Sequence, residues 1–69
     1  MSDIGKRIKE LREERGLTQE ELGRLLDTHA QTVFRYEAGS RVPSVRKLEE
    51  IARALEVEPG ELFPKVLAR

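Results

Sequence analysis

The sequence predicts an all-α domain of five short helices. Apolar residues recur at three- and four-residue steps in five separate segments, which is the spacing of one helix face. Glycine or proline stands between most of these segments, as is typical of helix ends, and no segment alternates in the manner of a strand. With 69 residues, the chain accommodates one domain, which we expect to span residues 1–69.

The first helix is expected to start at a cap provided by Ser2 or Asp3. Its core-facing positions follow helical spacing: Ile4, Ile8 and Leu11. Gly16 takes the left-handed conformation at little cost and should therefore end this helix.

The second helix begins with a capping-box pattern, Thr18 followed three residues later by Glu21. Leu17 and Leu22 flank the cap at the positions of a hydrophobic staple. Gly23 has no side chain to block the close approach of another helix. The expected core-facing residues are Leu22, Leu25 and Leu26.

A turn and a third helix follow directly. Asp27 tolerates a left-handed turn, Thr28 is expected to cap the next helix, and Gly39 should end it. Val33 points inward at helical spacing, while several polar residues are left outward: His29, Gln31, Thr32 and Arg35. Residues 18–37 therefore have the pattern of a helix-turn-helix, a motif whose second helix enters the DNA major groove.

A fourth helix is expected after Ser44, a good capping residue. Its predicted inward stripe consists of Val45, Leu48, Ile51, Ala52 and Leu55. Pro59 is placed to begin a short fifth helix carrying Leu62 and Phe63. Residues 64–69 then form either a frayed tail or part of a contact surface.

Composition narrows the classes of function. The chain has no Cys and a single His, so neither disulfides nor a zinc site is expected, and no cofactor or small-molecule effector is indicated. No apolar run is long enough to span a membrane, and we expect a cytoplasmic protein. Asp27 and His29 lie two residues apart without a Ser or Cys nucleophile placed beside them, so the protein is not expected to be an enzyme.

The charge balance is neutral, with 13 Lys and Arg against 13 Asp and Glu. This total argues against a nucleic-acid partner. Within residues 29–47, however, four basic residues face one acidic residue, a net charge of +3, whereas residues 48–69 carry a net charge of −2. The positive charge therefore gathers around the third helix and its following loop, and we expect modest non-specific affinity for DNA with a modest dependence on salt.

The segments IGKRIKELREERGLTQEEL, RYEAGSRVPSVRKLEEIARALEV and ELF resemble the phage repressor and Cro-like helix-turn-helix family of the xenobiotic-response-element type. The resemblance covers nearly the whole chain. It implies a compact five-helix, lambda-repressor-like domain that binds double-stranded operator DNA, usually as a dimer. The chain departs from the family pattern at four positions, Gly23, Asp27, Thr28 and Phe34, and the last is expected to point outward.

Family geometry places the start of the third helix against base edges. Gln31 is then expected to pair with adenine N6 and N7, or else to reach back and cap beside the turn. Arg35, one turn further on, would bind guanine or a phosphate, or remain solvated. Ala30 would touch a thymine methyl or be a plain surface residue, and Thr32 would bond a base or a phosphate. His29 would contact DNA or face water.

Phosphate contacts are expected on either side of this helix. Thr18 and Gln19 begin the second helix, where backbone N–H groups favour anions. Ser40 and Arg41 lie in the loop after the third helix, and Arg41 would grip the backbone or enter the minor groove. Arg46 starts the fourth helix and is a further candidate, against the alternative that it is merely a solvated charge.

The resemblance also implies a structural ion pair between Arg12 and Glu37, which would tie the first helix to the end of the third. Tyr36 is expected in or at the edge of the core. We expect a weak homodimer, or a monomer that pairs on DNA, with contacts from apolar residues near the C-terminus: Val57, Leu62, Phe63, Val66 and Leu67. Leu62 and Phe63 are alternatively expected in the core. The rival interpretation is a protein-interaction module, such as an antitoxin or a subunit of a larger regulator, which neutral charge and an outward Phe34 favour.

Overall fold

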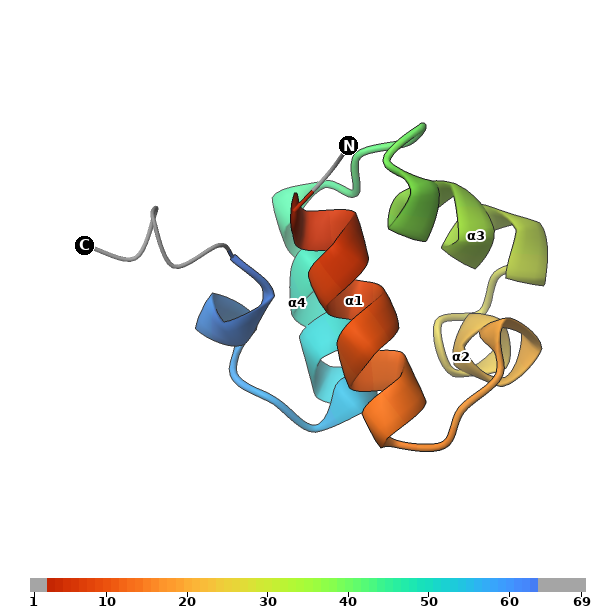
Figure 1. The fold of residues 1–69 in the computed structure, drawn as a ribbon, viewed down its shortest axis with the longest axis horizontal. Coiled ribbons are helices and arrows are strands. Elements are labelled where there is room, and N and C mark those ends of the chain that lie inside the picture. Colours follow the sequence, from red (N-terminus) through yellow and green to blue (C-terminus); the bar gives the residue numbers. More distant parts are fainter. Residues whose placement is uncertain (1–2, 64–69) are drawn as a thin grey trace.

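The computed structural model describes residues 3–63, which form four α-helices and one short 3-10 helix (Figure 1). The elements are α1 (Asp3–Glu14), α2 (Gln19–Leu25), α3 (Ala30–Ala38), α4 (Val45–Leu55) and η1 (Pro59–Leu62). The all-α prediction is confirmed, and no strand occurs in the described residues. The predicted fifth helix is a single 3-10 turn, because Pro59 and Gly60 leave few residues suited to a longer helix. The expectations for Ser2 and residues 64–69 lie outside the described residues.

Helices α1 and α4 lie side by side at the centre of the molecule, with α2 and α3 on one flank and η1 on the other (Figure 1). Contacts join α1 to α3, α4 and η1. Helix α1 is therefore the element against which both flanks pack, and it holds α3 at the periphery of the molecule.

A single core fills the space between these helices. It contains most of the predicted inward residues together with Tyr36: Ile8, Leu11, Leu22, Leu26, Val33, Tyr36, Leu48, Ile51, Ala52, Leu55 and Leu62. Ile4 and Leu17 pack against its edge. Leu62 is fully buried, so it serves the core and is not available for a dimer contact.

Two residues predicted to face the core are exposed. The Leu25 side chain is 59% exposed, because α2 ends there and only Leu22 and Leu26 face the core. Val45 is 73% exposed, because it lies one turn before Leu48, the first residue of α4 that is buried. Both segments are helical as predicted, but in each helix one residue of the apolar pattern lies beyond the part that is buried against the core.

The helix ends follow backbone chemistry closely. Gly16 and Gly39 have φ angles of 69° and 82°, and Asp27 also takes a left-handed conformation with φ of 57°, as predicted. The prediction that Thr28 caps α3 is wrong. The Thr28 N–H donates to the Gly23 carbonyl at 2.8 Å and thus belongs to the turn, so His29 is the N-cap of α3 and makes no side-chain capping bond.

The capping box at the start of α2 is present as predicted. The Glu21 N–H donates to Thr18 Oγ1 at 3.0 Å, and the Thr18 N–H donates to Glu21 Oε1 at 2.8 Å. The backbone N–H of Thr18 lowers the pKa of Glu21, since it favours the ionised carboxylate. Ser44 likewise caps α4 by accepting from the Lys47 N–H.

Gly5→Ala is expected to destabilise the protein by about 1–3 kcal/mol, because overpacking against a rigid neighbour forces the backbone to shift. A Cβ on Gly5 would collide with the Tyr36 carbonyl oxygen and lie 2.6 Å from that of Glu37, both backbone atoms of α3. Urea unfolding followed by circular dichroism measures the loss. Gly60→Ala is the control, because a Cβ there meets nothing within 4 Å. Equal stability of the two variants would contradict this account.

Candidate nucleic-acid interface

The turn between α2 and α3 packs directly on α2 at Gly23. A Cβ on Gly23 would lie 2.9 Å from the Thr28 carbonyl oxygen and 3.1 Å from the His29 carbonyl carbon. The glycine therefore does admit a close approach, although its neighbour is the backbone of the turn rather than the side of a second helix. This contact, together with the left-handed Asp27, fixes the direction in which α3 leaves the turn.

One face of α3 is open to solvent. It consists of four exposed residues related by steps of three and four: Gln31, Phe34, Arg35 and Ala38. We call this set the α3 stripe. Val33 and Tyr36 occupy the opposite face and are buried. The α3 stripe is thus a continuous surface held outward by the burial of the other side.

The predicted base-reading residues are all on or next to this surface. Gln31 and Arg35 are exposed on the same face, and within residues 3–63 the Gln31 side chain makes no hydrogen bond, so the capping alternative is not adopted. His29 is exposed at the N-cap. Ala30 and Thr32 are half-buried at the edges of the stripe. Their contacts with bases stay predictions.

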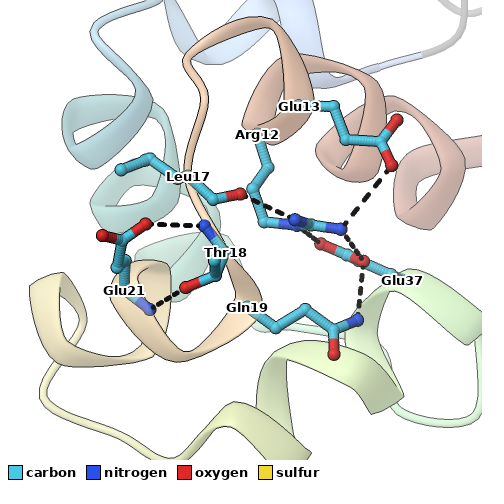
Figure 2. A network of polar contacts seen from close by, with 7 residues as sticks. All are labelled: Arg12, Glu13, Leu17, Thr18, Gln19, Glu21 and Glu37. Atoms are coloured by element: carbon cyan, nitrogen blue, oxygen red, sulfur yellow. Dashed lines mark hydrogen bonds and ion pairs between the residues drawn. The ribbon is translucent and has the colours of Figure 1, made fainter.

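A buried network holds α3 to the rest of the molecule (Figure 2). Arg12 and Glu37 form the ion pair that the resemblance implies, with Nε and Oε2 2.6 Å apart and Nη2 and Oε1 3.2 Å apart. Their side chains are only 10% and 4% exposed. Arg12 also donates to the Leu17 carbonyl at 2.7 Å, and Gln19 Nε2 donates to Glu37 Oε1 at 3.0 Å. The network therefore joins α1, the start of α2 and the end of α3.

This network changes the interpretation of two predicted phosphate contacts. The Gln19 amide is partly engaged by Glu37, and the Thr18 hydroxyl is engaged by the N–H of Glu21, so neither side chain is wholly free. Residue patterns did not indicate the Gln19–Glu37 hydrogen bond, because the two residues are 18 positions apart and polar.

Exposed arginines lie on the α3 stripe and in the segment that follows α3 in the chain. Within the described residues, Arg35, Arg41 and Arg46 are exposed and have no ion pair. Lys47, in contrast, pairs with Glu50 at 2.8 Å, and this hydrogen bond raises the pKa of Lys47 and lowers that of Glu50. Because Arg12 neutralises the Glu37 carboxylate, the positive charge of these three arginines is not cancelled by Glu37. The Ser40 hydroxyl donates a hydrogen bond to the Arg35 carbonyl.

Among residues 3–63, no group of three or more His, Cys, Asp or Glu side chains is placed to hold a metal ion. In the same part of the chain, no helix has the length and apolar character needed to cross a membrane.

Helices α2 and α3, joined through residues 26–29, together with the exposed α3 stripe define a helix-turn-helix domain. The chain belongs to the Cro/C1-type helix-turn-helix family, whose model matches residues 8–62. This is a family of DNA-binding regulators.

Similar proteins agree with this assignment. The chain is 34% identical to the HTH-type transcriptional regulator y4wC of Sinorhizobium fredii over 93% of the chain. It is 36% identical to multiprotein-bridging factor 1 of Candida albicans over 80% of the chain. It spans less than half the length of both, 45% and 36% respectively. The restriction-modification controller protein C.AhdI from Aeromonas hydrophila has a similar structure, with 40% identity, a TM-score of 0.83 and 87% of each chain covered.

Proposed function

We propose that this chain is the DNA-binding domain of a transcription regulator, in which α3 lies in the major groove of an operator. The single observation that carries the proposal is the α3 stripe, which exposes an amide and a guanidinium on one face of a short helix. The buried ion pair between Arg12 and Glu37 ties the end of that helix to α1. Rigid presentation favours specific recognition, because little conformational freedom is lost on binding.

The residues take distinct roles in this proposal. Gln31 pairs with adenine through N6 and N7, and Arg35 binds guanine O6 and N7 or a phosphate. Thr32 and His29 contact bases or phosphates at the sides of the groove, and Ala30 lies near a thymine methyl. These roles follow from the chemistry of each side chain and its place on or beside the exposed face.

Phosphate contacts flank the groove. The N-terminus of α2, at Thr18 and Gln19, offers backbone N–H groups to one strand. Ser40, Arg41 and Arg46 follow α3 and face the other strand. The absence of any ion pair for these arginines within residues 3–63 supports this assignment, since their charge is available for phosphates.

The protein further acts as a weak homodimer on an inverted repeat, with half-sites about 34 Å apart. Phe63 is 37% exposed and Val57 is half-buried, so both retain apolar surface for such a contact. Sedimentation of the protein with and without its operator tests the association. A monomer under both conditions would exclude the dimer.

Binding to mixed-sequence DNA is expected to weaken with salt, because each phosphate contact releases about 0.9 counterions. Fluorescence anisotropy between about 50 and 200 mM salt measures the slope. Arg41→Ala should reduce the slope by about one. Arg53→Ala is the matched control, since Arg53 is also exposed and has no ion pair within residues 3–63, but lies in the last turn of α4. Equal slopes for the two variants would contradict the proposed orientation.

A second candidate is a protein-interaction module. Similarity to multiprotein-bridging factor 1 and the zero net charge favour it. The same salt titration separates the candidates, because a module that binds only protein has little DNA affinity to lose.

A further inference from the structure

Phe34 is the only aromatic residue of the described α3 stripe, and its side chain is 55% exposed. It lies three residues after Gln31 and directly before Arg35, so a ligand that covers both of those side chains also covers the ring. Within residues 3–63, the other large apolar residues that are exposed lie on other segments: Leu25, Val42, Val45 and Phe63.

The surroundings of Phe34 are polar rather than apolar. A shallow hollow beside the ring is lined by Lys9, Gln19, Phe34, Glu37 and Ala38. Lys9 is exposed and has no ion pair within residues 3–63. Protein-docking sites are typically contiguous apolar patches, whereas this is a single ring among charged and amide groups.

A nucleotide matches this mixture better than an apolar protein surface does. In the major groove, thymine is the one base that presents an apolar group, its C5 methyl, and phenylalanine is among the side chains that contact it. The phosphate of the same strand supplies the negative charge that an unpaired ammonium attracts. The ring and Lys9 thus have complementary partners within one nucleotide.

From this arrangement we infer that Phe34 is a specificity-determining residue that selects thymine in each half-site through its methyl group. The inference rests on the proposed function and adds to it one base position and the chemistry by which it is read. It also gives the departure from the family pattern at Phe34 a role, because an aromatic ring on the α3 stripe would make an apolar contact with a base where a polar side chain would make a polar one.

The test removes only the methyl. Operator DNA is first selected from random sequences, and each thymine in a half-site is then replaced singly by deoxyuridine, which lacks the C5 methyl. For the wild-type protein, one such replacement should weaken binding about fourfold, the effect expected for one buried methyl. For Phe34→Ala, the same replacement should change affinity less than 1.5-fold (roughly the error of the assay), while Phe34→Leu should keep part of the effect.

Gln31→Ala is the matched control, because it alters the same helix face but should leave the deoxyuridine effect intact. Thermal unfolding of each variant checks the fold, which an exposed side chain should not affect. If no thymine shows a methyl effect that depends on Phe34, but binding still depends on Gln31, this inference is overturned and the proposed function stands. If the protein binds no DNA at all and Phe34→Ala instead abolishes a protein complex, both are overturned.

Discussion

Arg12→Ala is expected to lower the free energy of unfolding by about 3–5 kcal/mol, because it leaves the Glu37 carboxylate buried without its charge partner. The Glu37 side chain is only 4% exposed, and within residues 3–63 Gln19 would be the one side chain left to donate to it. The change also removes the hydrogen bond from Arg12 to the Leu17 carbonyl. Urea unfolding measures the loss, and the expected magnitude is a large share of the stability of a domain this small.

Arg15→Ala is the matched control for this prediction. Arg15 also lies near the end of α1 and pairs with Glu56 at 2.7 Å, but the side chains are 41% and 74% exposed. An exposed pair contributes about 0–1 kcal/mol. Where Arg12→Ala proves too unstable to measure, Arg12→Met combined with Glu37→Leu should recover much of the loss, since no charge is then left unpaired. Similar small losses for Arg12→Ala and Arg15→Ala would disprove the structural role of the buried pair.

Gln31→Ala is expected to weaken binding to the protein's own operator by about 1–3 kcal/mol, the usual contribution of a bidentate contact between an amide and adenine. Because Gln31 is exposed and its side chain makes no hydrogen bond within residues 3–63, the stability of the protein should not change. Loss of affinity with unchanged unfolding would therefore report on DNA contact alone.

Selection of bound sequences from random DNA shows where the contact lies. With Gln31→Ala, the base preference should relax at one position of each half-site and persist elsewhere. Arg41→Ala provides the comparison, because a phosphate contact should weaken binding to all sequences about equally. If Gln31→Ala selects the same sequences as the wild-type protein with the same strength, α3 does not read bases through this residue.

Much of the fold could be predicted because its determinants are local. The capping box of Thr18 and Glu21 and the left-handed positions of Gly16 and Gly39 depend on residues within one turn of each other. Family resemblance supplied one long-range contact, the pair of Arg12 and Glu37, which no periodicity indicates.

The incorrect predictions concern residues whose burial or hydrogen bonding depends on how the helices pack in space. Leu25 and Val45 fit the helical pattern, but their helices extend past the surface that would cover them. Thr28 is a good capping residue by type, yet its N–H is already bonded to the Gly23 carbonyl in the turn. In contrast, the expectation that Phe34 points outward is confirmed, because the position of this residue on the α3 stripe follows from helical spacing.

Residues close together in the chain are enough to predict the four α-helices, most of their ends and the helix-turn-helix, because backbone conformation and capping are local properties. The exposure of Leu25 and Val45, the contact of Gly5 with the backbone of α3 and the hydrogen bond from Gln19 to Glu37 become evident only in the folded molecule. The physical reason is that burial and long-range polar contacts depend on how whole helices pack, and packing is set by many weak contacts acting together.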